Sequence, residues 1–230
     1  MNSKKYELVA SDVNGLYRVK ALMDFGNVKA GDIGGYVSGE HNLSHYGNSW
    51  VYDNARVFEH ARVSNNASVS GLARVYGDAR VFEHARVSNN ASVSGLARVS
   101  DNARVFEHAR VSNNASVSGL ACVSGNARVS GSACVSGLAC VSGNAAISNT
   151  NEYFVVGPAL SSGRYTTVHK TAEGYQINCG CYTTDSIKGF KKRVKEVHSG
   201  DNLDSYLVIV TSLDAWVKLK LKREVENANS

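Results

Sequence analysis

A Phe-Glu-His triplet that could act in acid–base catalysis occurs three times in the chain. The copies begin at Phe58, Phe82 and Phe106, so a glutamate directly precedes a histidine each time. A carboxylate beside an imidazole is a common general acid–base pair. The alternative interpretation is that the triplets are exposed corner residues of a repeated fold, and the geometry of the repeats decides between the two.

A second group of candidate residues lies in the last third of the chain. Residues 157–164 contain hydroxyls, glycine and a guanidinium, which suit an anionic group. Cys179-Gly180-Cys181 could place two thiols on one strand face, with Cys181 just before a helix N-terminus and His169 or His198 as a base. The alternatives are an ordinary hairpin loop for the first segment, and a Cys/His metal site or small buried residues for the second. The predicted ligand-binding residues are Ser161, Ser162, Gly163 and Arg164.

Arginines that directly precede repeated valines form a third candidate set. Side chains alternate along a strand, so these arginines face outward if the valines face inward. A guanidinium ladder would bind phosphate or carboxylate groups. We favour the alternative, a solvated surface that discourages one molecule from stacking on another. The set is Arg56, Arg62, Arg74, Arg80, Arg86, Arg98, Arg104, Arg110 and Arg128.

The elements that position these residues follow from a period of six. From Val51 to Ile147 an aliphatic residue returns every six positions, and alanine stands four residues after nearly every one. An amphipathic helix needs a period near 3.6 and a simple strand a period of 2, so neither fits. A short strand followed by a tight corner does fit. Valine then points inward, alanine fills the corner, and Asn, Asp and Gly supply its unusual backbone angles.

Three such hexads close one triangular coil of 18 residues. The predicted fold is therefore mainly β, with a left-handed parallel β-helix over residues 43–150. The Val-x-x-x-Ala-x hexads resemble the hexapeptide-repeat family, whose members have this fold. The best-known relatives are trimeric acyl- and acetyltransferases with a loop that interrupts the coils and a catalytic histidine. The run from Val51 to Ile147 has no insertion, which departs from that pattern and puts the transferase activity in doubt.

The longer sequence repeat does not match the coil. The near-perfect repeat is 24 residues long, which is four hexads, whereas a coil is three. Each copy is therefore rotated by one face of the triangle, and no column of histidines or glutamates forms. We interpret the Phe-Glu-His triplets as corner residues for this reason. Cys122 and Cys140 are 18 residues apart and should be neighbours on adjacent coils.

The flanking segments are predicted to cap the β-helix, since a bare terminal coil is an open sheet edge. Residues 1–42 form an N-terminal β cap, with a hairpin around Asn14-Gly15 that pairs Tyr6 and Leu8 with residues 16–19. Residues 31–36 are glycine-rich and are interpreted as a turn. A phosphate-binding loop is the alternative, but it lacks the Lys-Ser/Thr ending of such loops.

Residues 151–230 are predicted to form a small α+β domain. Strands are expected at 153–156, 164–168 and 175–179. A helix should follow a cap at Thr183, Thr184 or Asp185, because apolar residues recur at helical spacing from Ile187 to Val197. A second helix is expected between Leu203 and Val217, although residues 206–210 could be a strand.

Composition excludes several classes of function. The formal charge of +5 is thinly spread, so strong nucleic-acid binding is not expected. We expect neither a signal peptide nor a membrane span, because the chain shows no apolar run of the length that either needs. The five cysteines are an odd number without an export signal, which indicates reduced thiols in the cytoplasm. No cofactor, metal or catalytic residue is expected.

The layout also resembles uncharacterised proteins of bacteriophages and prophages. In these, a Lys-Tyr-Glu-Leu start precedes the hexads, and a Tyr-Phe-Val-Val-Gly-Pro … Cys-Gly-Cys … His segment follows, as in this chain. The resemblance implies an accessory phage role in the cytoplasm of a bacterial host, including interference with host defence. We predict a non-catalytic binding or scaffold protein in which the β-helix is a rigid spacer and the C-terminal domain recognises a host protein or a small anionic ligand. It could assemble as a homotrimer. The alternatives are a sponge for a nucleotide-like anion and a hexapeptide-type acyltransferase.

Overall fold

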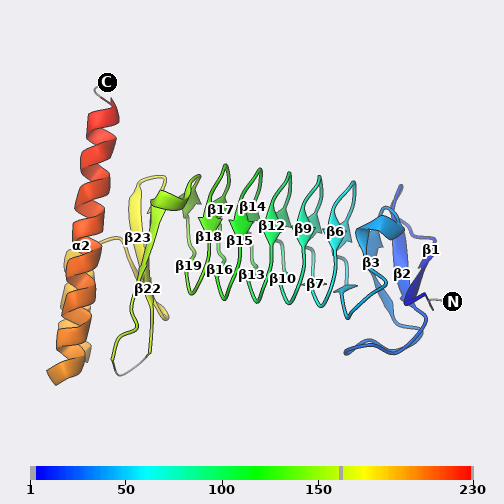
Figure 1. The fold of residues 1–230 in the computed structure, drawn as a ribbon, viewed down its shortest axis with the longest axis horizontal. Helices are drawn as coiled ribbons and strands as arrows, with labels where there is room; N and C mark the ends of the chain where they lie inside the picture. Colours follow the sequence, from blue (N-terminus) through cyan, green and yellow to red (C-terminus); the bar gives the residue numbers. More distant parts are fainter. Residues whose placement is uncertain (1–3, 161–162, 229–230) are drawn as a thin grey trace.

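The protein is built from three parts in a row, a β cap, a long solenoid and a sheet covered by two helices (Figure 1). The computed structural model describes residues 4–160 and 163–228, without the side chains of 221–228. The N-terminus and the long C-terminal helix lie at opposite ends of the molecule (Figure 1). The predicted mainly β architecture, a parallel β-helix between an N-terminal β cap and a C-terminal α+β unit, is confirmed.

The solenoid consists of two-residue strands that pair in parallel with the strand 18 residues further along, so each coil contributes one strand to each of three faces. The first face contains β4 (Trp50–Val51), β7 (Ser68–Val69), β10 (Arg86–Val87), β13 (Arg104–Val105), β16 (Cys122–Val123) and β19 (Cys140–Val141). The second contains β5 (Arg56–Val57), β8 (Arg74–Val75), β11 (Ser92–Val93), β14 (Arg110–Val111), β17 (Arg128–Val129) and β20 (Ala146–Ile147). The third contains β6 (Arg62–Val63), β9 (Arg80–Val81), β12 (Arg98–Val99), β15 (Ser116–Val117) and β18 (Cys134–Val135).

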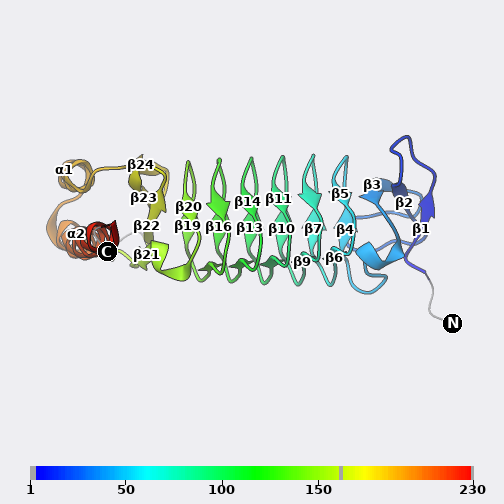
Figure 2. The same cartoon turned by 90° about the horizontal axis from the view of Figure 1, so that it is seen from above.

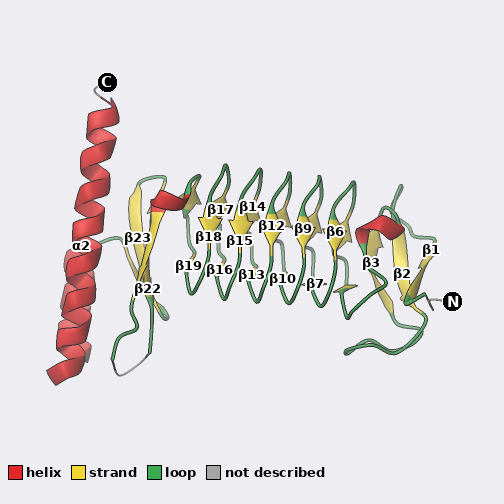
Figure 3. Ribbon diagram, viewed as in Figure 1, coloured by secondary structure: helices red, strands yellow, loops and turns green. Residues whose placement is uncertain are grey.

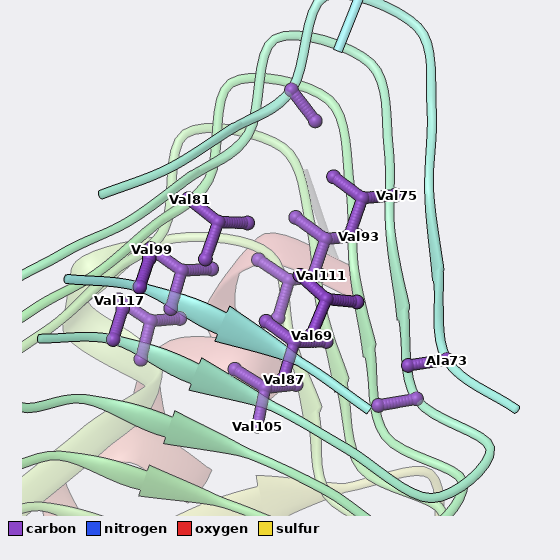
Figure 4. Packing of buried hydrophobic residues seen from close by; sticks show 14 of the residues in the cluster. Val69, Ala73, Val75, Val81, Val87, Val93, Val99, Val105, Val111 and Val117 are labelled. Carbon is purple, nitrogen blue, oxygen red and sulfur yellow. The ribbon is translucent and has the colours of Figure 1, made fainter. Parts of the chain in front are cut away.

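The core of the solenoid is made of stacked valines and alanines. Figure 4 shows three valine columns pointing inward, for example Val81, Val99 and Val117 from the third face. Every valine and alanine of the hexads is buried, with at most 1% of its surface exposed. Burying one valine contributes about 1.5–3 kcal/mol. The inward valine and the corner alanine are therefore as the period of six predicts.

Each corner begins with a residue in the left-handed backbone region. Eight of these residues are not glycine, and their φ angles lie between +54° and +60°. At five corners that residue is an Asp or Glu whose carboxylate accepts a hydrogen bond from the backbone N–H of the next coil. The glutamates of all three Phe-Glu-His triplets, Glu59, Glu83 and Glu107, belong to this group. Their carboxylates stabilise the corners, and the adjacent histidines are exposed.

The N-terminal cap extends the second face. The predicted hairpin is present, because β1 (Tyr6–Val9) pairs antiparallel with β2 (Tyr17–Ala21). The prediction of a turn at residues 31–36 is wrong over most of that segment. β3 (Ile33–Val37) is a strand that pairs antiparallel with β2 and parallel with β5, and a short 3-10 helix, η1 (Glu40–Asn42), follows it. Gly34 and Gly35 lie in this strand because the chain packs directly on Val51 and Ala55 of the first coil.

The C-terminal unit is a four-stranded antiparallel sheet with two helices on the side away from the solenoid (Figures 2 and 3). A 3-10 helix, η2 (Thr150–Glu152), leads into β21 (Tyr153–Val156), β22 (Thr166–Thr171), β23 (Gly174–Cys179) and β24 (Tyr182–Thr184). The helices are α1 (Ile187–Val197) and α2 (Gly200–Ala228), so residues 206–210 are helical. The cap of α1 is Ser186, whose Oγ accepts the N–H of Gly189 at 3.0 Å, and not Thr183, Thr184 or Asp185. Thr183 and Thr184 are instead part of β24.

The sheet seals the last coil of the solenoid through polar contacts. The backbone N–H of Cys140 donates to Thr167 Oγ1 at 2.9 Å, and Asn178 Nδ2 donates to the Cys140 carbonyl at 3.1 Å. Asn178 Nδ2 also lies 2.9 Å from Nε2 of His169, which is fully buried. His169 therefore belongs to this junction, and burial lowers its pKa to about 4.

Cys122 and Cys140 are register partners on the first face, as predicted. A hydrogen bond from the Cys122 thiol lowers the pKa of Cys140 to about 7 and raises that of Cys122. All five cysteines are free thiols.

This pair predicts a pH-dependent reactivity. Alkylation of Cys140 by iodoacetamide, followed by peptide mass spectrometry, should be half-maximal near pH 7, because the thiolate is the reactive form. Cys122→Ala removes the hydrogen bond and should slow alkylation at pH 7 by about tenfold. Cys134→Ala, on the third face, is the matched control and should leave the profile unchanged. An unshifted profile in Cys122→Ala would contradict the assignment.

Candidate functional site: a cationic cleft in the C-terminal unit

The two C-terminal segments selected from the sequence meet at one cleft of about 120 Å³. The loop before β22 contributes Arg164, the end of β23 contributes Cys179, and the turn between β23 and β24 contributes Cys181. The two helices supply the opposite wall. We call this the cationic cleft; its other lining residues are Tyr182, Phe190, Arg193, Val194, Val197, His198 and Tyr206.

Arg164 lies against the Cys179-Gly180-Cys181 turn. A Cβ built on Gly180 would stand 3.3 Å from Arg164 Nη1, and Gly180 has a φ of +61°. A side chain at this position would therefore be strained and would crowd the guanidinium. Of the other predicted ligand-binding residues, Gly163 is exposed, and Ser161 and Ser162 lie outside the described residues.

The helical wall adds a second guanidinium and an imidazole that the sequence interpretation missed as a group. Arg193 faces the Tyr182 ring at 6.0 Å and lies 4.0 Å from Glu196 at its exposed side. His198 follows α1 and stacks on Tyr206 with ring centroids 4.2 Å apart. Arg193 stands in a run of lysines and arginines on a helix, and such a run gives no sign of which member faces a cleft.

The electrostatics of the cleft favour an anion. Among the described residues, its lining contains two arginines and a histidine but no Asp or Glu. Arginine pairs readily with carboxylate and phosphate groups in bidentate geometry. Aromatic rings on the same wall supply apolar contact area for an attached group.

The same geometry gives little support to nucleophilic catalysis. Cys181 lies in the turn before β24, so it does not directly precede a helix N-terminus as the sequence interpretation required. It does not share a strand face with Cys179 either, since Cys179 ends β23 and is buried. Cys181 and His198 both line the cleft, yet the described residues show no hydrogen bond between them. Within that part of the chain, no group of three or more potential metal ligands occurs.

Comparison with known proteins supports the repeat architecture alone. A family model described as the YdcK beta solenoid repeat matches residues 121–137. The chain is a β-solenoid repeat protein. No curated protein sequence matches the solenoid or its caps. None of the described helices of this β-solenoid protein has the length and apolar character needed to cross a membrane.

Proposed function

We propose that this β-solenoid protein is a non-catalytic binding or scaffold protein encoded by a phage or prophage. The solenoid is a rigid spacer, and the C-terminal unit recognises a host protein, with interference in host defence as the outcome. The cationic cleft is the observation that carries the proposal, because it gathers Arg164, Arg193 and His198, and none of its described lining residues carries a carboxylate. The partner would place an acidic group in this cleft.

The host-protein proposal predicts a specific loss of binding. Full-length protein is immobilised, exposed to host lysate, and the retained proteins are quantified by mass spectrometry. A partner held through the cleft should be retained about tenfold less by Arg164→Ala/Arg193→Ala, because both charge-assisted contacts are lost. The control Lys191→Ala/Lys192→Ala removes the same total charge from exposed positions of α1, the helix that carries Arg193, and should retain the partner. Equal retention by both double variants would overturn the proposal.

A sponge for a nucleotide-like anion is a second candidate, favoured by the Tyr182 ring beside Arg193. It would show as a thermal shift with nucleoside triphosphates that Arg164→Ala abolishes. A shift that survives this substitution would exclude the cleft as the binding site. Acyl transfer has less support, since the coils run from β4 to β20 without the interrupting loop of those enzymes.

A further inference from the structure

The mismatch between the 24-residue repeat and the 18-residue coil creates a local irregularity on the solenoid. One corner column, at the end of the first face, contains Tyr52, Ser70, Ser88 and Phe106 in successive coils. Two aromatic residues are thus separated by two serines. Three coil spacings of about 4.8 Å place the aromatic positions roughly 14 Å apart.

This column borders a trough of about 480 Å³. Tyr52 and Phe106 stand at its two ends, and Ser70 and Ser88 lie between them. Arg86 and Arg104 line it from the adjacent strands of the first face, and asparagines from neighbouring turns complete it. No Asp or Glu lines it in the part of the chain that the structure describes.

The two arginines form an uncompensated pair of like charges. Arg86 and Arg104 are register partners on β10 and β13, and like charges directly opposite one another are destabilising. Neither takes part in the ion pairs that the described residues form. The nearby carboxylate of Glu107 is engaged by the backbone N–H of Gly125. Arg104 lies 5.3 Å from the Phe106 ring, which orients it without neutralising its charge.

We propose that this trough binds a phosphorylated sugar. The paired guanidiniums match the double charge of a phosphate monoester and can hold its oxygens in bidentate geometry. Serine hydroxyls and asparagine amides are donors and acceptors for sugar hydroxyls. The aromatic residues at the two ends pack against the apolar surfaces of the sugar or of a group attached to it. This site is on the solenoid and does not depend on the cationic cleft.

Titration calorimetry on the full-length protein tests the proposal with four probes: glucose 6-phosphate, adenosine monophosphate, glucose and inorganic phosphate. At least one of the two phosphorylated sugars should bind more tightly than glucose and inorganic phosphate, and the better one identifies the source of the ligand. Arg86→Gln/Arg104→Gln should weaken that binding by about tenfold or more.

Arg110→Gln/Arg128→Gln is the matched control, because these arginines are also register partners but lie on the second face. It should leave the affinity unchanged, as should Arg164→Ala in the cationic cleft. The proposal is overturned if neither phosphorylated sugar binds at millimolar concentration, or if inorganic phosphate binds as tightly as both. An equal loss in the two double variants would also overturn it.

Discussion

Gly35→Ala is expected to destabilise the N-terminal cap by about 3 kcal/mol, a large effect for one added methyl group. A Cβ at this position would lie 2.6 Å from the Ala55 carbonyl oxygen and 2.6 Å from Val51 Cγ1. The carbonyl is held in the β3–β5 ladder, where it accepts the N–H of Tyr36 at 2.8 Å. The added carbon can therefore be accommodated only if β3 separates from the first coil.

Separation of the cap would expose the first coil as an open sheet edge, which favours aggregation. Urea unfolding and hydrogen exchange of residues 33–57 would measure the loss. Gly15→Ala is the control, since Gly15 has a φ of +74° but open space around it. That variant should lose only about 1–2 kcal/mol from backbone strain. A loss in Gly35→Ala no greater than in Gly15→Ala would show that close packing on the first coil is not what requires glycine.

The strand that contains Gly35 also shows a limit of prediction from the sequence. Residues 51–147 were predictable almost residue by residue. A solenoid depends on contacts between positions 18 apart, and the period of six in the sequence indicates which residues occupy those positions. Gly31-Asp32-Ile33-Gly34-Gly35-Tyr36 carries the composition of a turn. It is mostly a strand because of a close approach to Val51 and Ala55, a tertiary contact that no local pattern encodes.

The cationic cleft was half predictable for a related reason. Arg164 and the Cys179-Gly180-Cys181 segment each stood out by residue type, but nothing in their spacing says that they meet. They meet because β22 and β23 pair with Thr166 opposite Cys179. This register brings the loop before β22 beside the turn after β23. Arg193 and Tyr206 join them only because both helices pack on the same side of the sheet (Figure 2).

The mismatch between the 24-residue repeat and the 18-residue coil has two consequences. It prevents the three Phe-Glu-His triplets from stacking, so their glutamates stabilise separate corners. It also makes the outward columns differ from one another, and among them only the column of Tyr52 and Phe106 encloses two serines between aromatic residues beside an arginine pair. A repeat in phase with the coil would have produced uniform ladders and no local trough.

Acidification from pH 7 to pH 4 is expected to weaken the junction between the solenoid and the C-terminal unit through His169. The side chain is fully buried, and burial lowers its pKa from 6.5 to about 4. Asn178 Nδ2 donates to His169 Nε2, so Nδ1 carries the proton and lies 3.3 Å from the Lys170 carbonyl oxygen. A protonated ring would bring a second N–H against the Asn178 amide donor. The neutral form is therefore the one that fits the fold.

The unfolded chain takes up a proton at this histidine below about pH 6.5, whereas the folded chain does not until about pH 4. The contribution of neutral His169 to the free energy of unfolding is therefore complete above pH 6.5. It falls as the pH decreases towards 4, by about 1.4 kcal/mol per pH unit and about 3 kcal/mol in all. Urea unfolding at a series of pH values, with NMR titration of the imidazole, measures this slope. His169→Gln should flatten this slope, whereas His60→Gln, at an exposed corner, should leave it unchanged. If the slope is the same in His169→Gln as in the unchanged protein, the acid sensitivity arises elsewhere and protonation of His169 does not weaken the junction.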